Sequence, residues 1–148
     1  MTPGHIRQAL LQDIDDVVSI WRASVLASHS FFSAEDVNSF TPGFYEYLQK
    51  QHANIWVWEE EEIQGFIGIE DTMILTLFVR PSHFRQGIGR KLIHFGVQAC
   101  DATRVSVYES NTRAVLFYKD LGFEIESRKE QDGDGRALPM LKMVLSRT

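Results

Sequence analysis

The sequence has a single cysteine, few prolines and no long apolar run, and each of these shortages excludes a class of protein. Cys100 cannot form an internal disulfide by itself, and a zinc site built from several cysteines is ruled out. No stretch approaches the roughly 18 consecutive apolar residues of a membrane-spanning helix. The first residues lack the positively charged and apolar segments of a secretory signal. We therefore expect a cytoplasmic protein with no membrane partner.

Basic residues are also outnumbered. Fifteen Lys and Arg stand against twenty Asp and Glu, which gives a net charge of −5. Because a nucleic-acid-binding protein normally presents a basic face, we expect no nucleic-acid partner. The hydrophobic fraction of 44% is sufficient for a packed core. With 148 residues and no repeat or linker, the chain is expected to form one domain over residues 1–148.

Hydrophobic periodicity predicts both helices and strands. Capping residues mark three helix starts in the first third of the chain: Asp13 with Asp16, Ser33 with Asp36, and Thr41 followed by Pro42. The other expected elements are strands at 6–9, 54–58, 63–70, 73–79 and 104–108, helices at 87–100 and 111–121, and a hairpin of strands 123–129 and 138–145. Residues 59–62 are expected to form a turn, and the apolar strand 73–79 is expected to be covered on both faces. This order predicts an α/β (α+β) fold with helices on both sides of a mixed sheet.

The loop between strand 73–79 and helix 87–100 carries the clearest chemical signal. Its free backbone N–H groups and the positive end of the helix dipole suit a phosphate group. Gly87 and Gly89 leave room for a close approach, and Arg85, Arg90 and Lys91 add positive charge. The run does not match a P-loop, and the third glycine of a dinucleotide fingerprint is replaced by Leu92. A simple helix start with two turn glycines is the remaining alternative.

Two motifs resemble the GCN5-related N-acetyltransferase (GNAT) family. The glycine loop is similar to that family's [Gln/Arg]-x-x-Gly-x-[Gly/Ala] signature, although Phe84 stands at its first position. Downstream, Asn111, Ala114, Phe117, Tyr118, Gly122 and Phe123 match every position of the second signature, Asn-x-x-Ala-x-x-Phe-Tyr-x-x-x-Gly-Phe. The second match is much more specific. The order of elements also agrees from residue 5 to about 146.

The resemblance implies a fold, a cofactor and a set of site residues. The sheet would be mostly antiparallel, with about six to seven strands splayed at its centre and about four flanking helices. Acetyl-CoA would lie in the splay as co-substrate. The residues implied in its binding are Phe78 and Val79 on the strand edge, the loop Arg85, Gln86, Gly87, Ile88, Gly89 and Arg90, and Asn111. Tyr118 would protonate the departing thiolate.

The base that deprotonates the amine is not evident from the sequence. Glu70 ends a strand where some members of the family keep such a carboxylate, and His29 lies in a polar-aromatic loop that usually shapes the acceptor pocket. Each residue also has a structural explanation, as a solvated strand end or a local hydrogen-bonding group. Cys100 is not needed, because direct attack on a thioester involves no covalent enzyme intermediate.

The resemblance implies an acetyl-CoA-dependent N-acetyltransferase in which a primary amine attacks the thioester through a tetrahedral intermediate. Two alternatives remain at this point: a CoA-binding sensor without turnover, and an enzyme that uses a longer acyl-CoA. No metal is expected. The acceptor would be a small-molecule or peptide amine, and the protein a monomer or homodimer.

Overall fold

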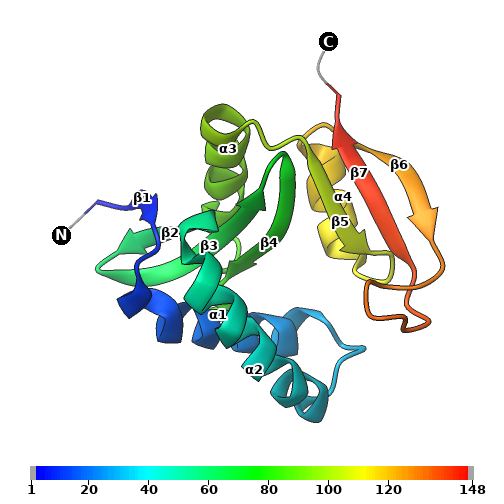
Figure 1. Cartoon of the computed structure of the whole chain (residues 1–148). Coiled ribbons are helices and arrows are strands. Elements are labelled where there is room, and N and C mark those ends of the chain that lie inside the picture. Colours follow the sequence, from blue (N-terminus) through cyan, green and yellow to red (C-terminus); the bar gives the residue numbers. More distant parts are fainter. Residues whose placement is uncertain (1–2, 147–148) are drawn as a thin grey trace.

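The computed structural model describes residues 3–146, which build a seven-stranded sheet flanked by four α-helices (Figure 1). The strands are β1 (His5–Gln8), β2 (Ile55–Glu60), β3 (Glu62–Glu70), β4 (Met73–Val79), β5 (Arg104–Tyr108), β6 (Phe123–Lys129) and β7 (Met140–Leu145). Their order across the sheet is β1-β2-β3-β4-β5-β7-β6, and every neighbouring pair is antiparallel except β4–β5. The predicted fold class is thus confirmed.

The helices cover the sheet on both faces. On one face, α1 (Ile14–Ser28) and α2 (Ala34–Gln51) pack against β2 and β3 around Phe66 and Ile55, which are fully buried. On the other face, α3 (Ile88–Cys100) and α4 (Thr112–Asp120) enclose a second cluster that contains Leu92 and Phe123. Three short 3₁₀ turns lie at Leu11–Asp13, His52–Asn54 and Pro81–His83. None of the described helices has both the length and the apolar character needed to cross a bilayer.

The sheet is splayed at its centre. The parallel ladder between β4 and β5 consists of Met73↔Arg104 and Ile74↔Val105, after which the two strands diverge (Figure 1). The expectation that 73–79 is covered on both faces is therefore wrong: Leu75 is 46% exposed, and most of β4 is only partly buried. Its apolar side chains line an opening rather than a closed core.

The second and third expected helices are one continuous helix, α2, with Pro42 in its interior. Ser33 caps it as predicted, since its hydroxyl accepts a bond from Asp36 N–H and Asp36 accepts one from Ser33 N–H. Thr41 does not act as a cap, because its hydroxyl donates to the Val37 carbonyl within the helix. Pro42 is exposed, so its missing N–H costs one helix bond without breaking the packing of buried Val37 and Leu48 on the opposite side.

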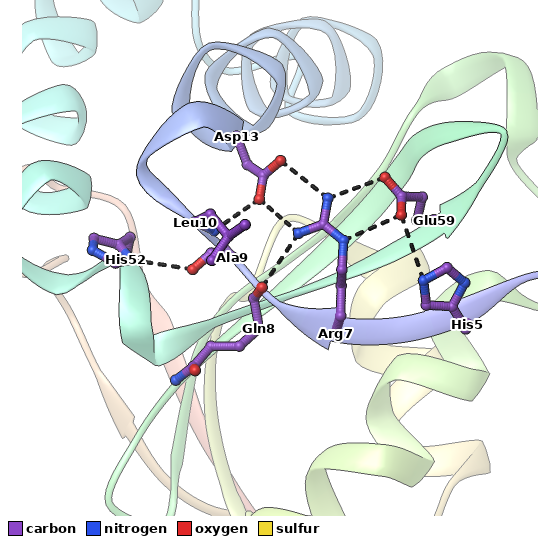
Figure 2. Close-up of polar contacts among 8 residues, drawn as sticks. All are labelled: His5, Arg7, Gln8, Ala9, Leu10, Asp13, His52 and Glu59. Carbon is purple, nitrogen blue, oxygen red and sulfur yellow. Dashed lines mark hydrogen bonds and ion pairs between the residues drawn. The ribbon is translucent and has the colours of Figure 1, made fainter.

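The expected cap at Asp13 is also wrong in detail. The Asp13 carboxylate makes no cap bond to α1; it accepts bonds from Leu10 N–H at 2.7 Å and from the Arg7 guanidinium at 2.7 and 3.1 Å (Figure 2). Arg7 also donates to Glu59 of β2. This ion-pair network joins β1, β2 and the start of α1, so Asp13 does not cap α1 but contributes to tertiary structure, in addition to its local bond to Leu10 N–H.

The turns follow the predicted positions with one difference. Residues 59–62 are mostly strand, and only Glu61, at φ +67°, makes the reversal. Asn111 caps α4 by accepting a bond from Ala114 N–H, and Gly122, at φ +99°, ends that helix as expected.

Candidate active site

Two connected cavities open where β4 and β5 diverge. The larger, about 590 Å³, extends from the end of β4 to the start of α3 and to α4. The second, about 420 Å³, lies between β4 and β5 and has a largely apolar lining. The residues common to both are His29, Leu77, Phe78, Asn111, Ala114 and Tyr118. Three of these are predicted site residues that carry reactive or hydrogen-bonding groups: His29, Asn111 and Tyr118.

The glycine loop forms one end of the larger cavity. Gly87 has φ +81°, a left-handed conformation that favours glycine, and it begins α3 without any side-chain cap. The first bond of the helix runs from Lys91 N–H to the Gly87 carbonyl, so the N–H groups before Lys91 receive no helical acceptor. A Cβ at Gly89 would lie 3.6 Å from Phe117 and 3.9 Å from Val79, both of which line the cavity. Gly87 is thus needed for its left-handed backbone conformation, and Gly89 for the space that it leaves in the cavity.

The charges around this loop differ partly from the prediction. Arg85 and Arg90 line the larger cavity, and Arg113, which the sequence did not single out, joins them. Arg90 also pairs with Asp120 of α4 at 2.7 Å. Lys91 instead lies over the Trp58 ring, 4.8 Å from its centre. Gln86 is exposed and does not line the cavity.

The edge of β4 lines both cavities through Phe78, while Val79 lines the larger one. Because the ladder to β5 ends at Ile74, the β5-facing edge beyond it has no strand partner among the described residues. The Val79 carbonyl accepts a bond from the Ser24 hydroxyl of α1 at 2.6 Å. Ser24, which is 2% exposed, therefore joins α1 to the strand that the family resemblance assigns to the cofactor.

His29 follows α1 directly and lies in the wall shared by the two cavities. Its Nδ1 is 2.9 Å from the Ser28 hydroxyl oxygen, and its Nε2 is 3.4 Å from the Asn111 amide nitrogen. Burial among aromatic rings lowers the pKa of His29 from its ordinary 6.5. The ring is therefore neutral at pH 7, as a base must be before it takes a proton.

Tyr118 is buried, with its ring packed against Phe117 and Phe123 at centroid distances of 5.3 and 5.5 Å. Its hydroxyl has no hydrogen-bond partner among residues 3–146. Burial raises the pKa of Tyr118 well above its ordinary value of 10. The phenol therefore keeps its proton throughout the physiological range.

An aromatic cluster of Phe31, Phe32, Phe40 and Tyr108 lies next to His29, and Tyr108 also lines the second cavity. Tyr108 of β5 lies within 5.0 Å of Phe31 and 5.5 Å of Phe32, measured between ring centroids. Arg136, from the β6–β7 loop, lies over Phe40 at 4.5 Å. These contacts connect the α1–α2 loop to the half of the sheet across the opening.

Asp132 organises the β6–β7 loop behind this cluster. Its carboxylate is nearly enclosed and accepts bonds from the Tyr108 hydroxyl, the Arg136 guanidinium, and the N–H groups of Asp134 and Arg136. Burial raises its pKa, but these bonds outweigh that effect, and the pKa of Asp132 is lowered overall. The carboxylate is thus charged at neutral pH and holds Tyr108 and Arg136 in place.

Several candidates lie away from the cavities. Glu70 is exposed at the end of β3, accepts a bond from the Tyr47 hydroxyl at 3.3 Å, and lines neither cavity. Cys100 is at the end of α3, and burial is the first cause of its raised pKa.

His83, which was not among the expected site residues, lines the larger cavity. Within the described part of the chain, no group of three or more His, Cys, Asp or Glu residues is arranged to hold a metal ion.

Sequence reasoning missed Ser24, Ser28, Arg113 and Phe117 as cavity-lining residues. Arg113 and Phe117 lie inside the second signature, at the position before its Ala and at its Phe, so the motif already contained them. Ser24 and Ser28 are spaced one helical turn apart, a pattern that indicates a shared face. Nothing in that spacing indicates which strand the face contacts.

Comparison with known proteins agrees with this arrangement. The family profile described as "Acetyltransferase (GNAT) domain" matches residues 27–145. The chain is 31% identical to peptidyl-lysine N-acetyltransferase YjaB of Salmonella typhimurium over 95% of this chain and 97% of that protein. It is 32% identical to peptidyl-lysine N-acetyltransferase YiaC of Escherichia coli over 86% of this chain and 88% of the other.

Solved structures share the fold. The solution structure of apo-form YjaB from Escherichia coli superposes with a TM-score of 0.88 at 28% identity, covering 99% of this chain and 100% of that one. The PaiA N-acetyltransferase of Thermoplasma acidophilum, solved in complex with coenzyme A, superposes with a TM-score of 0.74 at 19% identity. The latter covers 95% of this chain and 98% of that one, and at such identity it shows the fold alone.

Proposed function

Because the chain belongs to the GNAT family, and is thus an acetyl-CoA-dependent N-acetyltransferase, we propose that it acetylates the ε-amine of lysine side chains in peptides or proteins. The observation that carries the mechanism is the meeting of His29, Asn111 and Tyr118 in the wall shared by two cavities. One cavity suits the cofactor, and the other suits the reacting end of the acceptor.

Acetyl-CoA belongs in the larger cavity. Its pyrophosphate would contact the N–H groups at the start of α3, with Arg85, Arg90 and Arg113 nearby. The pantetheine arm would run along the free edge of β4 at Phe78 and Val79 and direct the thioester towards Tyr118. This placement needs no side chain at the first position of the loop signature, so Phe84 is compatible with binding. The acetyltransferase names of the relatives favour acetyl-CoA over a longer acyl-CoA as the donor.

His29 is the base in this mechanism. A lysine ammonium loses a proton to Nε2 of the neutral imidazole, which passes it to solvent. The free amine then attacks the thioester carbonyl carbon, and a tetrahedral intermediate forms. Glu70 is the weaker candidate, because its carboxylate lies outside both cavities.

Tyr118 is the general acid. When the intermediate collapses, the C–S bond breaks and the sulfur takes the phenolic proton, so CoA leaves as a neutral thiol. Tyr118 regains a proton from the ammonium nitrogen of the intermediate, directly or through water. The products are the N-acetylated amine and CoA, with one proton released to solvent.

The apolar second cavity supports a lysine acceptor. Met73, Leu75, Leu77, Val105 and Val107 are among its lining residues, and they suit the four methylene groups of a lysine stem. The curated relatives named for peptidyl-lysine acetylation match over most of this chain. We further propose that the enzyme forms one domain and works in the cytoplasm as a monomer or homodimer.

The test is a matched peptide panel assayed for CoA release and for product mass. One peptide has a blocked N-terminus and a single lysine, its control has arginine instead, and a third has a free N-terminal alanine and no lysine. Acetylation of the first peptide alone is expected. Acetylation of the third alone would favour an α-amine acceptor, as in the ribosomal-protein alanine N-acetyltransferase named for a Bacillus subtilis relative. No transfer to any amine would refute the proposed acceptor class.

A further inference from the structure

A chain of hydrogen bonds connects the cofactor strand to His29. The Ser24 hydroxyl donates to the Val79 carbonyl at 2.6 Å, and the Ser28 hydroxyl donates to the Ser24 carbonyl at 2.6 Å. The Ser28 oxygen in turn lies 2.9 Å from His29 Nδ1. Both serines line the larger cavity, on the last two turns of α1.

The direction of this chain determines the His29 tautomer. A serine hydroxyl has one proton, and that of Ser28 is directed at a backbone carbonyl, which can only accept. Towards the imidazole, the Ser28 oxygen can therefore only accept a bond, so Nδ1 must carry the proton. In a neutral imidazole the other nitrogen, Nε2, then carries the lone pair that can accept a bond or a proton.

Asn111 leads independently to the same tautomer from the other side of the ring. Its Oδ1 accepts the bond from Ala114 N–H that caps α4, which orients the amide. The amide NH₂ consequently faces His29 Nε2, at 3.4 Å. An NH₂ group can only donate, so Nε2 must be an acceptor. Two elements far apart in the sequence thus favour the proton on Nδ1, and Ser28 makes the shorter of the two contacts.

We propose that Ser28 is a positioning residue that holds His29 as the Nδ1–H tautomer, so that Nε2 carries the lone pair that takes the proton of the reacting amine in place of the 3.4 Å contact from Asn111. This inference rests on the proposed role of His29 as base. The other tautomer would place a proton on Nε2, where it would block acceptance of a second. Ser28 itself touches neither the amine nor the thioester in this proposal.

The surroundings of His29 leave this tautomer neutral. Phe31 and Phe32 from its own loop and Phe78 from β4 present uncharged rings, and Tyr108 from β5 presents a phenol whose pKa burial raises. Asn111 is uncharged. The charged residues that line the same cavity are Arg85, Arg90 and Arg113, and burial alone accounts for the lowered pKa of His29.

The experiment reads the tautomer directly, by ¹⁵N NMR of histidine-labelled protein at a pH where His29 is neutral. His29→Gln assigns the signals, since it removes them. In the parent, we expect Nδ1 to show the ¹⁵N chemical shift of a protonated ring nitrogen and Nε2 that of an unprotonated one. In Ser28→Ala only the longer 3.4 Å contact from Asn111 still favours Nδ1–H, so the two forms should mix. We expect kcat to fall about threefold to tenfold, which is less than the ~10²–10⁴ expected from loss of the base itself.

Three further measurements distinguish positioning from a general structural effect. Ser28→Thr, which keeps a hydroxyl, should restore both the tautomer and kcat. Ser39→Ala removes a matched serine of α2 that donates to Asp36, and it should leave both unchanged. CoA affinity should stay at the parental value in Ser28→Ala.

Opposite results would overturn the proposal. An Nε2–H tautomer in the parent, an unchanged tautomer in Ser28→Ala, or full turnover in His29→Gln would each do so. A parent that acetylates no lysine peptide would instead contradict the proposed acceptor. The NMR measurement needs no acceptor, so it would still decide the tautomer of His29.

Discussion

The ring and the hydroxyl of Tyr118 have different surroundings, which allows their contributions to be separated. The ring packs between Phe117 and Phe123, while the hydroxyl has no partner within residues 3–146. Removing the hydroxyl should therefore cost little stability, since no buried partner is left unsatisfied.

Tyr118→Phe is expected to lower kcat at least about tenfold, because the thiolate loses its proton donor and water replaces it only in part. Steady-state kinetics with a lysine peptide measures this, and calorimetry should show the parental CoA affinity. Tyr45→Phe is the matched control, since it deletes a surface hydroxyl bonded to Asp15. Full turnover in Tyr118→Phe would remove Tyr118 from the mechanism.

At the scale of elements, the loop that begins α3 combines a conformational and a spatial requirement. Gly87 adopts φ +81°, and Arg85 adopts φ +67° although it carries a side chain. Such a non-glycine residue is uncommon and costs conformational energy. The loop therefore keeps a strained shape at the end of the larger cavity, where its N–H groups before Lys91 have no helical acceptor.

Gly89→Val should weaken CoA binding about tenfold or more. Its Cβ would meet Phe117 and Val79 only at ordinary contact distances, so the fold tolerates it, but the added methyl groups occupy space that the cofactor needs. Calorimetric titration with CoA measures the effect. Gly43→Val, at an open position of α2, should leave the affinity unchanged. Parental affinity in Gly89→Val would contradict the assignment of the pyrophosphate to this loop.

The network around Arg7 joins β1, β2 and the start of α1 (Figure 2). Asp13→Asn should lower the free energy of unfolding by about 1–3 kcal/mol at neutral pH, because the buried guanidinium contact loses its charge. Asp16→Asn, at an exposed position of the same helix turn, should change it little.

The same network sets a pH dependence. The bonds from Arg7 hold the pKa of Asp13 below its ordinary 3.8, so the stabilisation is fully present above that value and is lost as the pH falls through the lower folded-state pKa. Denaturant titrations of the parent and of Asp13→Asn should show that the difference between their free energies of unfolding shrinks in that acid range. A difference that stays constant down to full protonation would disprove the ion-pair explanation.

On the scale of the whole molecule, two halves of the sheet meet through the short β4–β5 ladder and, across the opening, through the aromatic cluster and Arg136. Arg136 pairs with Asp132 and Asp134 and lies over Phe40. Because Arg136 also lies 5.8 Å from the ring centre of Phe32, in the α1–α2 loop that begins at His29, we expect it to restrain that loop.

Arg136→Ala should speed hydrogen exchange in residues 29–33 and raise the acceptor KM several-fold, since a cation–π contact of about 0.5–1 kcal/mol and two ion pairs are lost. CoA affinity should not change, because Arg136 does not line the larger cavity. Arg128→Ala, which breaks pairs with Glu109 and Glu130 on the same hairpin, is the control. Unchanged exchange in residues 29–33 would show that the loop is held by packing alone.

Local patterns were enough to predict most helices and strands, Gly87 and Gly89 at the start of α3, and the cap at Asn111. Caps, turns and hydrophobic periods depend on neighbouring residues, which the sequence shows directly. They failed at Thr41–Pro42, where packing of Val37 and Leu48 keeps one helix continuous, and at Asp13, whose partner Arg7 lies on another element. The second signature likewise singled out Asn111 and Tyr118, because all of its positions lie within one short segment of the chain.

Only the tertiary structure decided that His29 rather than Glu70 lines both cavities together with Tyr118, and that Ser24, Ser28 and Arg113 line the larger one. These relations join segments up to 82 residues apart, as between His29 and Asn111. Contacts at such separations depend on how β4 and β5 diverge and how α1 packs against β4. No local pattern encodes that arrangement, because it is a property of the sheet as a whole.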